Sequence, residues 1–311
     1  MMFHYTSQKG FEGIVKEDGI HLWFSDARYM NDSSEILSAK KFLDQAADEL
    51  FHEGKIPSDL HKEVKKIEHT PKKIDGVKFR NTKPREIAID IQSAYYYTFL
   101  CCFSSEADSL PMWNYYLKND SNGYAIGFDF DGIDISTCRI VGKVKNDADY
   151  TFEEEISKVL YTDSEKVEVF KSEILDLLKN WEEHSDDHTQ QLAHLAQFHM
   201  AFEDYSTVFK DYHFAYENEY RMLATVKSSE SYIGKEHRDD IKFRLSHGLA
   251  IPYFELLIPH KQVLKAVSVS PMVGLNSNAG FVKESMRTYL TNLGYTHDIE
   301  IRCSEIPLRY Y

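Results

Sequence analysis

Short apolar runs typical of β-strands recur along this chain at irregular intervals, and only some of them are separated by helical patterns. A doubly wound parallel sheet needs a regular alternation of strands and helices, and the sequence has no such rhythm. Strands are expected at 3–6, 20–24, 97–103, 124–130, 139–144, 216–226, 254–258, 263–269 and 299–303. The order predicts an α+β fold with a mainly antiparallel, split β-sheet core and flanking helices.

Helical spacing of apolar residues is found between some of these strands. Ser7 is placed to cap a first helix that ends near Gly19, and Pro84 precedes another helix that continues to residue 94. A short helix is expected within 105–117. The remaining helices are expected at 34–52, 164–184, 187–210 and 279–293. The length of 311 residues fits one large domain with insertions or two closely packed ones, and we assign the elements to a single domain, 1–311.

The net charge of −14 is concentrated in one part of the chain. Residues 147–213 hold 17 Asp and Glu against 5 Lys and Arg, whereas 60–85 holds 9 Lys and Arg against 3 Asp and Glu. We predict that 147–213 is an acidic helical insertion that could bind a protein partner. The region 57–85 contains Pro57, Pro71 and Pro84 and is predicted to be a basic mobile loop, which either binds a phosphate-bearing partner or is only solvated.

Several classes of protein are excluded by motifs that the sequence lacks. The longest apolar run, near 95–103, is too short to span a membrane, and the N-terminus shows no secretion signal. The four cysteines form no CxxC pair, so a reduced, cytoplasmic protein without a metal is expected. His184 and His188 lie four residues apart but lack an HExxH or ExxH pattern. Neither GxGxxG, a P-loop nor GxSxG is present.

The strongest candidate for chemistry is the segment 216–226. Strand alternation would place Glu217, Glu219 and Arg221 on one face, about 6.5–7 Å apart. Two carboxylates with one guanidinium can hold a sugar hydroxyl and stabilise positive charge on a sugar carbon, because the arginine keeps a neighbouring carboxylate ionised. The alternative is a solvent-facing charge ladder on an edge strand.

Two further clusters contain polar and aromatic residues that suit a binding cleft. His4 and Thr6 share one face of the first strand, and Tyr5 points to the other face. Trp113, Tyr116 and Tyr124 could form a stacking wall for a flat ring, although aromatic residues at this spacing are often core. The other polar and aromatic candidates near these segments are Ser25, Tyr29, Asn31 and Ser104.

Taken together, the three clusters resemble a bacterial family of unknown function, DUF2971, over about 2–270. The resemblance rests on the following residues in order: Tyr5-Thr6-Ser7, Ser25-Asp26, Asn31-Asp32, Glu35, Cys102-Phe103-Ser104, Met112-Trp113, Tyr116, Gly123, Ile126-Gly127-Phe128 and 216–221. The family name itself implies no activity.

The layout is also similar, more remotely, to ADP-ribosyltransferase-like enzymes, including toxins that modify DNA. This resemblance implies that His4 and Thr6 hold the substrate NAD, while Tyr29 or Trp113 stacks on nicotinamide. Glu219 would be catalytic and Glu217 would orient the acceptor. Arg221 is placed beside them, and the remaining NAD-binding candidates are Tyr5, Ser25, Asn31 and Ser104. Arg221 and the lack of a Ser-Thr-Ser strand motif depart from the toxin pattern.

The resemblance implies an effector that cleaves NAD and modifies a protein or nucleic acid in bacterial toxin or phage-defence systems. Two alternatives remain open from the residues. One is a non-enzymatic interaction module in which Glu217, Glu219 and Arg221 form a structural ion network. The other is a nuclease-type effector that combines His4 with the carboxylates.

Overall fold

The computed structural model describes residues 1–30, 34–68, 74–75, 78–82, 86–90, 93–116, 123–143, 150–153, 155–228, 238–246, 248–271 and 278–307. For 34–37, for residue 135 and for the described residues from 74 to 96, the description covers the backbone only.

The architecture is α+β, as predicted, with a mainly antiparallel sheet in the order β13-β14-β3-β7-β1-β8-β15-β16. Only β15 and β16 pair in parallel. The strands of this path are β1 (Met2–Ser7), β3 (Gly19–Asp26), β7 (Ser93–Ser104), β8 (Gly123–Phe128), β13 (Lys242–Ser246), β14 (Leu249–Ile258), β15 (Leu264–Val269) and β16 (Glu300–Cys303).

Shorter strands extend this path. β12 (Glu219–Ser228) pairs with β7 along its whole length, and β10 (Tyr150–Phe152) and β11 (Ser157–Lys158) pair with the other edge of β12. β2 (Val15–Lys16) pairs with β3, β9 (Arg139–Ile140) with β14, and β4 (Ile74–Asp75) with β7. A separate hairpin contains β5 (Lys78–Thr82) and β6 (Glu86–Asp90).

The sheet splits along one edge of β7. Ser25 of β3 lies opposite Leu100, whereas Phe3 of β1 lies opposite Ser104. From these two points β3 continues the sheet toward β14 and β13, and β1 continues it toward β8, β15 and β16. The other edge of β7 is covered by β12, so β12 lies beside the split.

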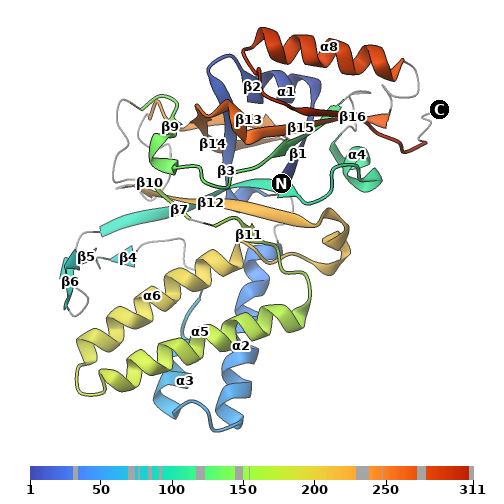
Figure 1. Ribbon diagram of the computed structural model, residues 1–311. Coiled ribbons are helices and arrows are strands. Elements are labelled where there is room, and N and C mark those ends of the chain that lie inside the picture. Colours follow the sequence, from blue (N-terminus) through green and yellow to red (C-terminus); the bar gives the residue numbers. More distant parts are fainter. Residues whose placement is uncertain are drawn as a thin grey trace.

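Helices cover both sides of this sheet (Figure 1). α1 (Gln8–Ile14) and α8 (Ala279–Asn292) lie on one side, and a helical layer lies on the other. Ser7 caps α1 as predicted, since its hydroxyl accepts a hydrogen bond from Gly10 N. The layer contains α2 (Ser34–His52), α3 (Ser58–Lys65), α5 (Asp163–Glu183) and α6 (His188–Ser206), and α4 (Leu110–Tyr116) lies near β1.

The apolar core has three parts that follow this layering. The largest contains Phe24, Phe103 and Phe254 and lies on the α1 side of the sheet. The second packs α2, α5 and α6 against Leu100 and Leu223 of the sheet. The third joins Phe3 and Tyr5 of β1 to Trp113 of α4. Alternate residues of β1 and β7 therefore contribute to different parts of the core.

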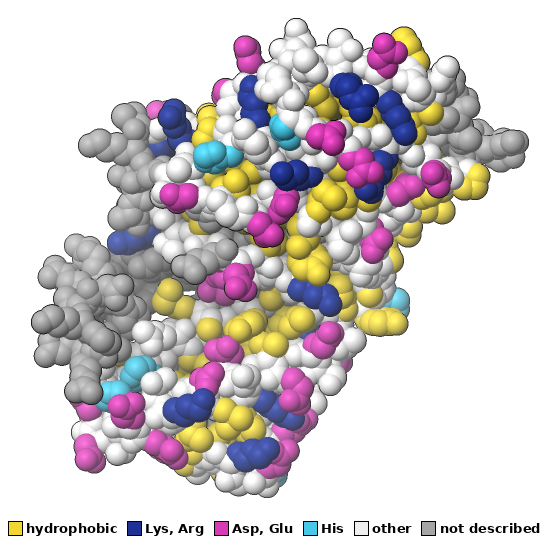
Figure 2. Space-filling view, viewed as in Figure 1, with side chains coloured by type: hydrophobic (Ala, Val, Ile, Leu, Met, Phe, Trp, Pro, Cys, Tyr) yellow, Lys and Arg dark blue, Asp and Glu magenta, His cyan; other side chains and the backbone are white. Residues whose placement is uncertain are grey.

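The predicted acidic insertion does contain a helical pair, α5 and α6, and Thr162 forms a capping box with Glu165 at the start of α5. It is not purely helical, because β10 and β11 also lie within it and join the sheet. Figure 2 shows acidic and basic side chains interspersed over the helical layer. Lys171, for example, bridges Glu49 and Glu168.

The prediction of a basic mobile loop over 57–85 is wrong for part of this region, because Ser58–Lys65 form the helix α3. Leu60 and Val64 are one turn apart and both are buried, so tertiary packing of this face fixes the helix. Two of the described cations of this region are also paired. Lys65 bonds to Asp48, and Lys66 bonds to Glu63. The remaining described residues to 82 include the short strands β4 and β5.

Two other predicted helices differ from the structure. The helix expected from Pro84 to residue 94 is replaced by β6 and by the start of β7, whose backbone pairs with β12 as far as Tyr95 opposite Ser228. Pairing across the sheet overrides the local spacing here. The helix expected to reach Gly19 ends at Ile14, because Val15 and Lys16 form β2 against β3. No helix in the described part of the chain has the length and apolarity needed to cross a bilayer.

Candidate active site

Glu219 is the first residue of β12, and Glu217 precedes the strand. The predicted strand 216–226 is therefore wrong at its start. Tyr212–Glu217 form a 3-10 helix, η3, which Asp211 caps by accepting from His213 N. Asn218 then adopts a left-handed conformation with φ 42°, a conformation that asparagine tolerates well, and this turns the chain into β12.

The two carboxylates nevertheless converge, because Lys210 bonds to both of them. Its Nζ lies 2.6 Å from Glu217 Oε2 and 2.8 Å from Glu219 Oε2. Lys210 follows α6, and its backbone N donates to Leu160 O. The shared cation places Glu217 and Glu219 together, and strand alternation does not.

Arg221 completes this cluster from the neighbouring position of the same face of β12. Its Nε donates to Glu219 Oε1 at 2.9 Å and its Nη2 to Glu219 Oε2 at 3.1 Å, and Nη1 donates to Thr207 O. Only 1% of Arg221 and 4% of Glu219 are exposed, and β12 lies between β7 and the strands β10 and β11. The solvent-facing ladder on an edge strand is therefore excluded. We call Lys210, Glu217, Glu219 and Arg221 the charged cluster.

Hydrogen bonds from β7 and from Tyr161 fix the charged cluster in place. Ser104 lies opposite Glu219 in β7 and its hydroxyl donates to Glu217 O at 2.7 Å. The Glu219 backbone N donates to Tyr161 Oη at 2.9 Å. Cys102 lies opposite Arg221, and its thiol bonds to the Glu219 carboxylate. The buried thiol has a pKa well above its usual range.

The two carboxylates of the charged cluster have opposite pKa shifts. Burial alone would raise the pKa of Glu219, but the charges of Arg221 and Lys210 outweigh burial and lower this pKa to about 2. Burial raises the pKa of Glu217 and outweighs the attraction of Lys210. Glu219 is thus held ionised, and Glu217 is the carboxyl of the pair that takes up a proton more easily.

Tyrosines border the charged cluster on the α4 side. Tyr116 is 38% exposed, and its ring centroid lies 6.1 Å from that of Tyr5 and 5.3 Å from that of Tyr115. Burial of the Tyr116 hydroxyl, with the nearby Cys102, Glu219 and Glu217, raises the pKa of this tyrosine. Tyr116 therefore combines a ring with solvent access and a hydroxyl close to the carboxylates.

His4 and Thr6 lie on the opposite face of the sheet from Glu219. His4 Nδ1 is 2.8 Å from Cys102 O, and its ring contacts Phe103, which alternates with Ser104 along β7. Thr6 packs against α1, where a Cβ at Gly10 would lie 1.8 Å from Thr6 Oγ1. The predicted shared face of His4 and Thr6 is correct, but the structure does not bring this pair to the carboxylates. A nuclease site that combines His4 with them is disfavoured for the same reason.

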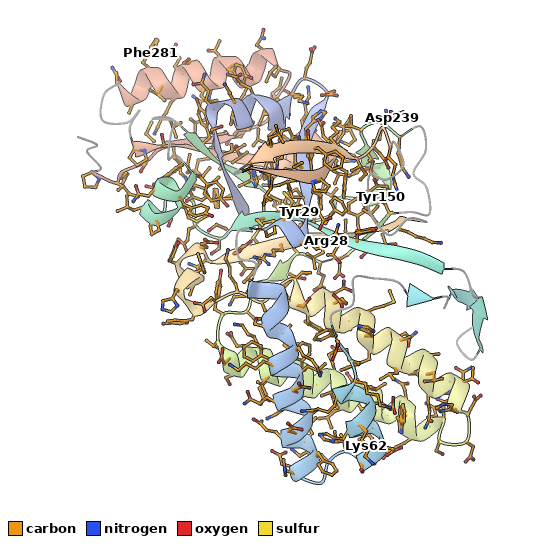
Figure 3. The ribbon with its side chains drawn as sticks, turned by 180° about the vertical axis from the view of Figure 1, so that it is seen from behind. Arg28, Tyr29, Lys62, Tyr150, Asp239 and Phe281 are labelled. Carbon is orange, nitrogen blue, oxygen red and sulfur yellow. The ribbon has the colours of Figure 1, made fainter. Side chains whose placement is uncertain are left out.

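The structure disperses the other predicted binding residues. Tyr5 does lie on the Glu219 side, where its hydroxyl donates to Glu106 O. Trp113 has no exposed surface and donates to Asp108 Oδ1, so its indole belongs to the core. Ser25 bonds to Arg244, and Tyr29 lies beside Arg28 where β3 approaches the helical layer (Figure 3). Asn31 lies outside the described residues.

His184 of the insertion lies close to another histidine. The ring of His184 lies 5.1 Å from that of His194, across the turn between α5 and α6, and not against His188. Among the described residues, no group of three or more His, Cys, Asp or Glu could hold a metal ion.

Lys210 and Tyr161 are site residues that sequence reasoning missed. Both belong to the segment predicted as an insertion, and neither lies in a recognisable motif. Lys210 is one of only five basic residues among 67 in that segment, counting 147 to 213 inclusive. An isolated lysine beside a pair of glutamates is the only local signal that points to this ion pair.

Acid is expected to destabilise the fold through three carboxylates whose pKa is lowered to about 2: Glu219, Asp240 and Glu255. Their usual values are 4.5 for Glu and 3.8 for Asp, so the stabilisation is present above about pH 5 and is lost as the pH falls toward 2. The raised pKa of Glu217 acts in the opposite direction. Urea unfolding midpoints should therefore fall steadily between pH 5 and 3, and more gently in Asp240→Asn.

The charged cluster lies within a segment of the chain that matches a known family model. Residues 112–222, from α4 to β12, match the model of a family described as protein of unknown function (DUF2971), which confirms the predicted family over these residues. No curated protein and no solved structure matches the chain significantly. The ADP-ribosyltransferase resemblance stays a prediction.

Proposed function

We propose that this member of the DUF2971 family is an ADP-ribosyltransferase-like enzyme that cleaves NAD and transfers ADP-ribose to a protein or nucleic acid, as an effector in bacterial toxin or phage-defence systems. The observation that carries the proposal is the pair Glu217 and Glu219, which bind one ammonium group and have opposite pKa shifts. Carboxylates whose environments separate their pKa values in this way are typical of acid–base partners in catalysis.

The chemistry needs one ionised carboxylate and one that accepts a proton. When the bond between nicotinamide and the ribose C1′ breaks, the electron pair leaves with nicotinamide and positive charge develops on the sugar. Glu219, kept ionised by Arg221 and Lys210, would stabilise this charge. The acceptor atom then bonds to C1′ and loses its proton, which Glu217 would receive.

The tyrosines beside the charged cluster suit the flat nicotinamide ring better than Tyr29 or Trp113, to which the resemblance assigns the stacking role. Tyr116 has an accessible ring, and Tyr5 and Tyr115 are its aromatic neighbours. His4 and Thr6 lie across the sheet, so we assign the stacking role to Tyr116 and no role at the reacting carbon to His4.

The test is to incubate the purified protein with NAD, alone and with bacterial lysate or DNA, and to follow nicotinamide release and modified products by mass spectrometry. Wild-type protein is expected to release nicotinamide. Glu217→Gln should retain release by hydrolysis but reduce the transfer to an acceptor by about 100-fold or more, the usual contribution of a general base. Equal transfer by Glu217→Gln and wild type would exclude this role.

A second candidate function is a non-enzymatic interaction module, and a specific observation favours it. Both carboxylate oxygens of Glu219 are bonded to cations. One member of the charged cluster, Lys210, and two of its partners, Tyr161 and Thr207, come from the insertion. The cluster therefore also ties the helical layer to the sheet. Absence of nicotinamide release under every condition would favour this function.

A further inference from the structure

A second surface with ligand-binding character lies on β3, β14 and β13, away from the charged cluster. Trp23 is 45% exposed and stacks on Tyr253 with ring centroids 4.4 Å apart and an angle of 29° between the rings. Lys242 lies opposite Tyr253, and Tyr253 lies opposite Ser25, so these residues share one face of the sheet. We call Trp23, Tyr253, Lys16, Lys242 and Arg244 the Trp23 surface.

The exposure of Trp23 is unusual in this chain. The other two tryptophans, Trp113 and Trp181, are 0% and 6% exposed, and both donate their indole N–H to an aspartate. Trp23 instead presents a broad ring to solvent from the middle of a strand, and Tyr253 supports this ring from below. Such a ring forms a ready platform on which another flat ring can stack.

Cations surround this platform. Lys16 and Lys242 approach opposite oxygens of Glu255, at 3.0 and 2.6 Å, so one carboxylate holds two ammonium groups beside Trp23. Glu255 also bonds to His21 at 2.6 Å, and His21 bonds to Asp18. This part of the Trp23 surface thus carries charge of both signs. The carboxylate of Glu255 holds Lys16 and Lys242 in place, and both lysine side chains stay partly exposed.

Arg244 differs from these lysines because its hydrogen-bond partner is a neutral hydroxyl. Its Nη2 donates to Ser25 Oγ at 3.2 Å, and within the described part of the chain no carboxylate pairs with it. Its Nε is buried and has no hydrogen-bond partner. Without an acidic partner among the described residues, the guanidinium keeps its positive charge available to an anionic ligand. Ser25 and Trp23 are two residues apart on the same face, about 6.5–7 Å.

We infer that the Trp23 surface binds single-stranded nucleic acid, with a base stacked on Trp23 and a neighbouring phosphate at Arg244. A stacking ring next to a cation without an acidic partner matches a base that carries a phosphate. A duplex keeps its base faces stacked inside the helix and cannot offer one to Trp23, whereas an unpaired strand can. Lys16 and Lys242 would meet further phosphates. This inference is independent of the proposed NAD chemistry, since it concerns binding alone.

The test uses the tryptophan fluorescence of the whole protein, because an exposed Trp23 reports contact that the two buried tryptophans do not. Titration with a single-stranded oligothymidylate of about 12 nucleotides, within the usual range of site sizes, should quench the exposed component of the emission at low salt. Fluorescence anisotropy of the same oligomer, carrying a dye label, should give the binding affinity. A duplex that contains this strand should bind much more weakly.

Variants of the two faces of β13 and β3 separate specific binding from general attraction to cations. Trp23→Ala should weaken the oligomer about 5- to 150-fold, the range for loss of one stacked base. Arg244→Gln should reduce the slope of affinity against salt by about one. Phe243→Ala is the matched control, because Phe243 is also exposed but lies on the other face of β13.

Three outcomes would overturn the inference. The first is the absence of any binding at low salt by the folded wild type. The second is equal binding by wild type and Trp23→Ala, with the melting temperature of the variant unchanged. The third is equal competition by polyglutamate, which carries negative charge without bases and would identify an acidic protein segment as the partner.

Discussion

Replacing Arg221 with leucine is expected to lower the free energy of unfolding by about 3–5 kcal/mol, the usual cost of removing one partner of a buried ion pair. Arg221 is almost fully buried and binds both oxygens of Glu219 as well as Thr207 O. The substitution leaves the Glu219 carboxylate with one cation, Lys210, inside the protein. Urea unfolding at pH 7 measures the loss, and a small change in the midpoint would contradict this account.

Two further variants identify the origin of that loss. Lys179→Met removes an ion pair with Asp176 whose members are both well exposed, and it should change stability by less than about 0.5 kcal/mol. The double variant Arg221→Leu with Glu219→Leu removes both buried charges and should recover part of the lost stability. If the double variant loses more free energy of unfolding than Arg221→Leu and Glu219→Leu lose together, packing and not charge dominates.

Replacing Glu219 with glutamine is expected to reduce nicotinamide release about 100- to 1,000-fold, the range for removal of one electrostatic contact to the transition state. Glutamine is nearly isosteric but neutral, so the charge that stabilises the sugar cation is lost. The same change leaves Arg221 and Lys210 short of a counter-charge, so the variant should also be less stable. Release is therefore measured at a temperature where circular dichroism shows that the variant is folded.

The matched control for this variant is Asp240→Asn. Asp240 is also buried, its pKa is also lowered to about 2, and it is paired with Arg238 and Tyr150, apart from the charged cluster. Asp240→Asn should lose stability as Glu219→Gln does but retain nicotinamide release. Loss of release in both variants would show that Glu219 acts through stability alone.

The fold could be predicted because its main elements carry strong local signals. The runs around Phe24, Phe254 and Val267 are continuous buried strands, and Ser7 and Thr162 cap helices as their position in the sequence indicates. Local signals failed where pairing with another strand decides the structure. Residues 86–90 form β6 against β5, and Ser93 and Ala94 begin β7 opposite β4.

The candidate site could be predicted only in part. Glu219 and Arg221 share a face because they are two residues apart on one strand, which the sequence shows. The side of the sheet that His4 faces depends on how β1 meets β7, namely on Phe3 lying opposite Ser104, and no local pattern encodes that register. The role of Lys210 likewise depends on where the chain returns to the sheet after α6.

The contacts that complete the sheet join residues very far apart along the chain. Ser104 and the backbone O of Glu217 are separated by 113 residues, and His21 and Glu255 by 234. Pairings of this kind form slowly, because the long intervening chain must close into a loop, at a cost in entropy, before the two residues can make contact. During synthesis, β3 cannot pair with β14 until β14 has been made, and β7 cannot pair with β12 until β12 has been made. Most of the chain is therefore synthesised before the charged cluster can form. Through most of translation the nascent chain would thus lack the ion pairs of the charged cluster.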